Sequence, residues 1–124
     1  MKKALPKIMV EKSLYDIYED EFNMIFIVKT YLIYNYVSKK FKIGRSKDIG
    51  MRIKQLEKEY GNNIILIDYC KGDIEKSLHR FFSNKKDNGE WFNLNDDNIK
   101  FIKDSFNIQN QRLKELKKKL KKIK

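Results

Sequence analysis

The sequence predicts an α+β fold in which helices flank a small, mainly antiparallel sheet of about three strands. Three observations support this prediction. Segments typical of strands and helices follow one another in the order ββαβαα, the apolar spacing changes from strand-like to helical near residue 44, and the chain ends in a lysine-rich helical pattern. The length of 124 residues suits one domain with a single modest core.

The first two strands are expected to form an antiparallel hairpin over residues 24–43. Residues 24–36, MIFIVKTYLIYNY, are rich in β-branched and aromatic side chains and contain no glycine or proline, which is typical of a strand. The polar VSKK that follows is expected to be the turn. FKI then resumes the apolar pattern, which Gly44 ends.

A first helix is expected from Asp48, a residue type that caps helices, to Gly61, a residue type that ends them. Between the two, apolar residues recur at spacings of four, three and four: Ile49, Ile53, Leu56 and Tyr60. The apolar run NIILIDY, residues 63–69, then predicts a third strand at the centre of the sheet.

The second half of the chain is expected to add two helices and a short extended segment. Residues 72–73 open a helix with a buried stripe formed by Ile74, Leu78, Phe81 and Phe82. EWFNL, residues 90–94, should be extended and seal the core with its two aromatic rings. Asn95 or Asp96 can cap a last helix, whose apolar residues are Ile99, Ile102 and Phe106.

Most of the net charge of +11 lies in the tail. Residues 112–124 hold eight Lys or Arg and one Glu, which gives +7. A second basic group lies within residues 39–54, whose single acid is Asp48. Leu113, Leu116, Leu120 and Ile123 recur at three, four and three, which predicts an amphipathic tail helix. Its role stays open between a solvated helix, phosphate binding, weak self-association and contact with a membrane surface.

We expect three segments: an N-terminal extension over residues 1–22, a domain over residues 23–106 and a basic amphipathic helix over residues 107–124. SLYDIYEDEF in the extension is compatible with a short helix or a loose segment. Cys70 is the only cysteine and His79 the only histidine, which excludes a disulfide or a Cys/His zinc site within one chain.

The sequence shows no membrane or export signal. No segment approaches the roughly twenty apolar residues of a membrane span, and Pro6, Lys7 and Glu11 interrupt any signal-peptide core. We therefore expect a soluble intracellular protein, in the cytoplasm, or in the nucleus or a viral factory if the source is eukaryotic or viral.

Five polar residues are expected to meet at one edge of the sheet: Tyr31, Lys42, Arg45, Arg52 and Glu75. The hairpin can bring Tyr31 close to Lys42, while Arg52 and Glu75 each lie one turn into a helix. A phenol, cations and one carboxylate suit a phosphodiester, because cations bind the phosphate and the carboxylate can hold a divalent metal ion.

The joint spacing of these residues resembles the GIY-YIG nuclease superfamily. KTY ends at Tyr31, eleven residues before Lys42 of KIG, and Arg52 follows Gly44 by eight. DIEKSLHRFF looks like the helix that bears the family's metal-binding glutamate, which would be Glu75. GEWFNL is similar to the closing element of a phage and large-virus branch, which commonly has KIG in place of YIG.

The resemblance covers roughly residues 24–106 and departs from the family pattern at three places. The GI of the first motif is KT, the second tyrosine is Lys42, and Asn93 is only a candidate for the family's late asparagine. Tyr34 or Tyr36 would replace Tyr31 if the hairpin register were shifted, because a shift of one residue reverses the faces of a strand.

The resemblance implies a metal-dependent DNA endonuclease. Tyr31 would act as the general base or position it, Arg52 would stabilise the developing charge, and Glu75 would bind one Mg²⁺ or Mn²⁺ ion. A free tyrosine has a pKa of about 10, so cations would have to lower it for Tyr31 to act as a base. The metal ion and Lys42 are candidates for that role, and Lys42 could instead hold a phosphate.

The remaining candidates have supporting roles. His79 could orient Glu75, assist proton transfer or only support the fold. The candidate DNA-binding cations are Lys40, Arg45, Lys47 and Lys54. Two other functions stay open: a nucleic-acid-binding module on the same scaffold with weak or no catalysis, and an interaction protein that self-associates through its C-terminal helix.

Overall fold

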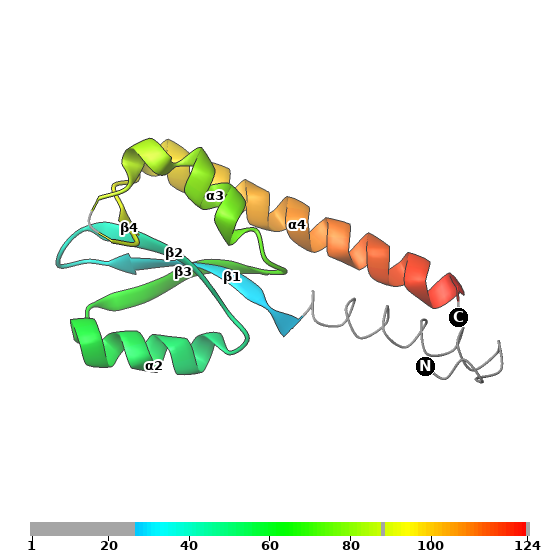
Figure 1. Cartoon of the computed structure of the whole chain (residues 1–124), viewed down its shortest axis with the longest axis horizontal. Coiled ribbons are helices and arrows are strands. Elements are labelled where there is room, and N and C mark those ends of the chain that lie inside the picture. The colour runs from blue at the N-terminus through cyan, green and yellow to red at the C-terminus, as the bar shows by residue number, and fades with distance from the viewer. Residues whose placement is uncertain (1–26, 88, 124) are drawn as a thin grey trace, which may run out of the picture.

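A computed structural model describes residues 27–87 and 89–123; the predicted N-terminal extension lies outside this part of the chain. Its four strands form one antiparallel sheet in the order β3-β1-β2-β4. Helix α2 covers one face of the sheet, and α3 and α4 cover the other (Figure 1). The predicted α+β class is confirmed, but the sheet has four strands because the EWF segment also pairs.

The predicted hairpin consists of β1 (Lys29–Asn35) and β2 (Lys40–Ser46). At the turn, the Asn35 side chain accepts hydrogen bonds from the backbone N–H groups of Val37 and Ser38, at 3.0 and 3.2 Å. The first strand begins later than predicted, because Ile27 and Val28 are not part of it and residues 24–26 lie outside the described chain. The second strand continues past its predicted end at residue 43.

Helix α2 (Ile49–Tyr60) is confirmed with its predicted caps. The Asp48 carboxylate accepts a hydrogen bond from Met51 N at 3.0 Å, which satisfies one of the free N–H groups of the first turn. At the other end, Gly61 has a φ of 82° and its N–H donates to the Glu57 carbonyl at 2.8 Å. The left-handed φ explains the glycine, since other residues adopt it at a cost.

Strand β3 (Ile64–Lys71) lies at an edge of the sheet, so its predicted central position is wrong. Strand β1 occupies the centre because it pairs with both β2 and β3. The apolar run misled the prediction because helices cover both faces of β3. Ile64 and Leu66 pack on the α2 side, whereas Ile67 and Cys70 pack on the other side.

The second half contains α3 (Glu75–Phe81), a short 3₁₀ helix (Ser83–Lys85), β4 (Trp91–Phe92) and α4 (Asp96–Ile123). Asn95 caps α4: its side chain accepts from Asn98 N at 2.8 Å, and the Asn98 side chain accepts from Asn95 N at 3.0 Å. Phe81 was predicted to be buried but is 62% exposed. Its ring stacks on Phe101 at a centroid distance of 4.5 Å.

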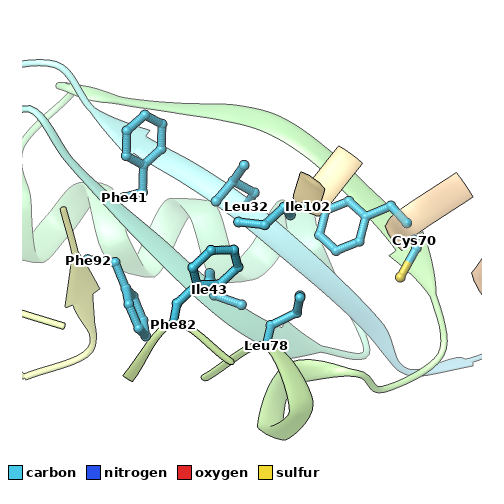
Figure 2. Packing of buried hydrophobic residues seen from close by; sticks show 9 residues of the cluster. Leu32, Phe41, Ile43, Cys70, Leu78, Phe82, Phe92 and Ile102 are labelled. Carbon is cyan, nitrogen blue, oxygen red and sulfur yellow. The ribbon is translucent and has the colours of Figure 1, made fainter. Parts of the chain in front are cut away.

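Two apolar clusters lie on opposite faces of the sheet. Figure 2 shows the larger one, in which sheet residues meet Leu78 of α3 and Ile102 of α4. Phe92 of β4 is fully buried there, as predicted, whereas Trp91 is only partly buried and packs on the other face. Cys70 also belongs to the larger cluster, and burial raises the pKa of its thiol to about 11.

The smaller cluster packs under α2 and is formed by Tyr31, Ile33, Leu56 and Ile64. Because side chains alternate along a strand, neighbouring residues of β1 serve different clusters. Tyr31 thus belongs to the face that α2 covers.

Helix α4 runs without a break from Asp96 to Ile123 and so passes through the predicted boundary at residue 107. Its C-terminal half extends beyond the sheet (Figure 1). Self-association through this half remains a prediction. In the described part of the chain, no helix is both long enough and apolar enough to cross a membrane.

Candidate active site

The candidate site lies at the open edge of β2, which we define as residues 43–46. Strand β4 pairs only with Phe41 and Lys42, so within residues 27–87 and 89–123 no strand covers the open edge. Tyr31 of β1 pairs with Gly44, and its ring lies across this glycine. A Cβ at Gly44 would lie 2.5 Å from Tyr31 Cζ and 2.9 Å from Cε1. Gly44 therefore makes room for the phenol within β2, rather than ending the strand as predicted.

Arg52 reaches the same phenol from α2. Its Nε donates to Tyr31 Oη over a long 3.4 Å, and its Nη1 donates to Gln55 Oε1 at 3.1 Å. Tyr31 is only 1% exposed. Burial raises the pKa of Tyr31, and the hydrogen bond from Arg52 offsets this only in part. The phenol in this structure is therefore protonated near neutral pH, contrary to what a general base requires.

The other two candidate tyrosines lie elsewhere. Tyr34 packs in the larger cluster, with its ring 4.6 Å from that of Phe41. Tyr36 is exposed beyond the end of β1, where its hydroxyl donates to the Asn62 carbonyl at 3.1 Å. Of the three, Tyr31 is the one that contacts Arg52.

Glu75 begins α3, with its side chain 19% exposed between a cation and a histidine. Its carboxylate lies 3.7 Å from Arg45 Nε and 4.0 Å from His79 Nε2. Arg45 also pairs with Asp73 at 2.5 Å. Arg45 thus contacts two carboxylates at the beginning of α3, so its predicted role as a DNA-binding cation would compete with these contacts. The negative charges of Glu90 and Glu75 also act to raise the Tyr31 pKa.

Thr30, which we did not single out from the sequence, positions α3. Its hydroxyl donates to the Gly72 carbonyl at 2.8 Å and accepts from Ile74 N at 2.9 Å. These bonds join β1 to the start of the helix that carries Glu75. The signal in the sequence was a threonine inside an apolar strand, since a buried hydroxyl needs a partner.

His79 supports the open edge. Its Nε2 lies 2.7 Å from the Ile43 carbonyl, so this nitrogen carries the proton and donates it. The ring also meets Phe92 edge-on, at a centroid distance of 4.9 Å. Because Nε2 is engaged with the backbone, its contact with Glu75 at 4.0 Å is secondary. This geometry favours the supporting role among the three that the sequence left open.

Lys42 is 4% exposed and its Nζ pairs with Glu90 Oε1 at 2.5 Å. Its hydrogen bond lowers the pKa of Glu90. Arg52, and not Lys42, is the cation that lowers the pKa of Tyr31. Glu90 was missed in the sequence because it lies 48 residues from Lys42; only the pairing of β4 with β2 reveals the contact.

The other predicted DNA-binding cations are spread over the surface. Lys40 begins β2, where it pairs with Asp87 at 3.2 Å and donates to Asn93 Oδ1 at 2.8 Å. Asn93 therefore lies at the opposite end of β2 from the Tyr31 phenol. Lys47 and Lys54 are exposed.

Next to the Tyr31 and Arg52 pair is a cleft of about 460 Å³, lined by Lys42, Arg52, Leu56, Glu59, Tyr60, Gly89, Glu90 and Trp91.

A metal ion at this site would take few ligands from the protein. Within the described residues, no three His, Cys, Asp or Glu side chains form a group that could hold a metal ion. Glu75 offers one accessible carboxylate, and His79 Nε2 is engaged with a carbonyl. This donor set fits Mg²⁺ or Mn²⁺, which accept water and phosphate oxygens as further ligands.

A family model matches residues 29–122, which span the sheet, the candidate site and nearly all of α4; it describes the T5orf172 domain. The chain belongs to the T5orf172 domain family. This family is phage-associated and of the nuclease type, which supports a nuclease or DNA-binding module as the functional class. No curated protein and no solved structure matches the chain.

Proposed function

We propose that this protein is a metal-dependent DNA endonuclease of the GIY-YIG type that hydrolyses phosphodiester bonds. The observation that carries the proposal is the contact of Arg52 with the Tyr31 phenol across Gly44. In the GIY-YIG pattern, the matching tyrosine, glycine and arginine occur in this order. Membership of a nuclease-type family supports the same conclusion.

Arg52 would bind the scissile phosphate and stabilise the negative charge that develops on it. Its side chain is partly exposed and lines the cleft together with Lys42 and Trp91. A guanidinium group suits this role because its planar donors match two phosphate oxygens at once. To do so, Arg52 would exchange its long bond to Tyr31 for a bond to the substrate.

Tyr31 would orient the attacking water as a neutral phenol. Burial raises its pKa, so deprotonation near neutrality is unfavourable. The hydroxyl oxygen can still hold a water molecule once Arg52 has moved. The proposal thus gives Tyr31 a positioning role.

Glu75 would hold one divalent ion, whose chemistry would be to neutralise charge on the phosphate and the leaving oxygen. Thr30 and His79 would fix the helix that carries this carboxylate, through Gly72, Ile74 and Ile43. Arg45 would leave Glu75 and keep its pair with Asp73.

The alternative is a nucleic-acid-binding module with weak or no catalysis. Two observations favour it: Tyr31 is 1% exposed, and Arg45 already contacts the predicted metal ligand. In that case the basic surfaces would bind the phosphate backbone without cleaving it.

Cleavage of supercoiled plasmid at low salt, with Mg²⁺, Mn²⁺ or EDTA, tests the proposal. Wild type should nick the plasmid only with metal, and Glu75→Ala and Arg52→Ala should abolish nicking. Asp104→Ala and Lys58→Ala are matched controls, because both residues are exposed on helices away from the site.

Two results would change the conclusion. Tight binding without cleavage in either metal would establish the binding module. Full cleavage by Glu75→Ala would show that Glu75 is not the metal ligand. It would thereby contradict the GIY-YIG type of mechanism.

A further inference from the structure

Two depressions flank the C-terminal half of α4. One, of about 750 Å³, has a largely apolar wall that includes Ile108, Leu113 and Leu116. The other, of about 700 Å³, is lined by Tyr69, Lys71, Asn110, Leu113, Lys114, Lys117, Lys118 and Lys121. They share Leu113 and together form a surface that we call the α4 groove. Its occupant must offer both apolar and negatively charged groups.

The chain enters the described structure beside this groove. Gly72 N donates to the Val28 carbonyl at 2.6 Å. Gly72 in turn packs directly on α4, since a Cβ there would lie 2.5 Å from Gln109 Nε2 and 2.9 Å from Leu113 Cδ1. The described chain therefore begins, at Ile27 and Val28, close to Leu113, where the two depressions meet.

The preceding residues have the composition that the groove requires. Residues 13–26 contain Asp16, Glu19, Asp20 and Glu21 and no Lys or Arg. They also contain large apolar residues, among them Leu14, Ile17 and Phe22. Residues 1–12 differ, with four lysines and one glutamate.

We propose that residues 14–26 dock in the α4 groove of their own chain. Their carboxylates would lie against Lys114, Lys118 and Lys121, and their apolar side chains would pack beside the buried Leu113 and cover Leu116, which is 43% exposed. The reach is sufficient: Lys121 lies eight residues beyond Leu113, about 12 Å along the helix, and even a helical segment of nine residues spans about 13 Å.

Charge and polarity favour this occupant over two others. A second copy would bring another tail of +7 against the first, which is repulsive. A nucleic acid would satisfy the lysines but leave the apolar wall beside Ile108 and Leu116 in contact with water. Residues 14–26 would supply carboxylates to the lysines and apolar side chains to this wall.

Docking would make residues 14–26 compete with phosphates for the lysines of α4. This consequence rests on the proposed function, whereas the docking itself does not. Neutralising the four carboxylates should then strengthen binding to duplex DNA severalfold, because the lysines would regain their full charge.

Carbodiimide cross-linking of the full chain tests the docking, since this reagent joins carboxylates to lysines that touch them. Trypsin releases residues 13–29 as one peptide, because no Lys or Arg lies between Lys12 and Lys29. We expect this peptide to be joined to Lys114, Lys118 or Lys121, with far fewer links to Lys47 and Lys54. A mixture of ¹⁴N- and ¹⁵N-labelled protein separates links within a chain from links between chains.

Thermal unfolding provides a second readout. Ile17→Ser and Phe22→Ser should lower the Tm, because each would remove apolar contact with α4, whereas Ile8→Ser should leave it unchanged. Links mainly between chains would assign the groove to a second copy. Unselective links with unchanged Tm would show that residues 14–26 do not dock. Both readouts are independent of DNA, so they decide the docking even if the protein cleaves and binds none.

Discussion

Cations at and beside the open edge of β2 contact partners within the folded sheet and its helices, whereas the lysines on the C-terminal half of α4 lie on an exposed helix surface. Arg45 pairs with Asp73, Lys42 with Glu90, and Arg52 contacts Tyr31. On α4, the lysines within residues 114–122 are exposed, and Lys118 lies 3.7 Å from Glu115. The two regions have the same sign of charge but differ in the groups that surround their cations.

This difference separates two ways of using charge. Side chains held by partners have defined directions, which a reaction at one phosphorus atom requires. Exposed lysines along a helix give affinity for any phosphate backbone, and binding through them responds strongly to salt. Substitutions at the open edge should therefore change cleavage more than binding, and substitutions on α4 should do the reverse.

The largest effect is expected for Arg52→Lys. This change keeps the charge but loses the planar donors that reach Tyr31 and Gln55. Cleavage should fall by about 10²-fold or more, while affinity for duplex DNA changes little. Initial nicking rates and a binding titration measure the two effects. Lys58→Arg, the reverse exchange on the same helix, should change neither the nicking rate nor the affinity. Unaltered nicking by Arg52→Lys would contradict the view that side chains near the open edge control cleavage.

Gly44→Ala should destabilise the fold at the open edge. The new Cβ would overlap the Tyr31 ring, and forcing atoms into a packed site costs about 1–3 kcal/mol. Chemical denaturation measures the loss. Gly50→Ala is the matched control: its nearest contact would be Asp48 Oδ1 at 3.5 Å, and it should be neutral or stabilising by about 0.4–1 kcal/mol. Equal effects of both changes would mean that Gly44 does not accommodate the phenol.

Lys114→Gln combined with Lys118→Gln should weaken DNA binding without changing cleavage of bound DNA. The slope of log affinity against log salt should decrease by about two, and affinity at low salt by about tenfold. Fluorescence anisotropy at several salt concentrations measures both. Lys100→Gln with Lys103→Gln, on the N-terminal half of α4, provides the comparison. Identical slopes in both double variants would remove any special role of the C-terminal half.

The smallest effect concerns the pH dependence of the Lys42 and Glu90 pair. The folded-state pKa of Glu90 is lowered, so the pair stabilises the protein above the unfolded pKa of about 4.3. Glu90→Gln should therefore reduce stability at pH 7 by about 1 kcal/mol. The difference from wild type should disappear as the pH falls through the folded pKa. Urea denaturation between pH 3 and 7 checks this, and a constant difference would contradict it.

Local signals predicted the fold well where they were strong. The caps of α2 and its apolar spacing gave both ends of that helix, and the turn at residues 36–39 followed from a polar break in an apolar pattern. The strand order was harder to predict. Because helices cover both faces of β3, this edge strand has the same apolar pattern as a central strand.

The candidate site likewise combines residues that local signals predicted with contacts that they did not. The spacing of Tyr31, Arg52 and Glu75 could be recognised in the sequence, because each lies near the beginning or middle of a strand or helix with a clear apolar pattern. The contacts of Glu90 and Thr30 could not be predicted, since they join segments more than forty residues apart. The burial of Lys42 likewise depends on β4, whose pairing covers only two residues and has a weak local signal.

The short β4 leaves residues 43–46 of β2 without a neighbouring strand on the side away from β1, and this has a consequence for colloidal behaviour. An uncovered strand edge is a template on which another chain can add and start aggregation. Here the first carbonyl beyond the paired residues, that of Ile43, is bound by His79, and two cations, Arg45 and Lys47, follow it. His79, Arg45 and Lys47, which we assigned to the candidate site or to DNA binding, therefore also oppose edge-to-edge association.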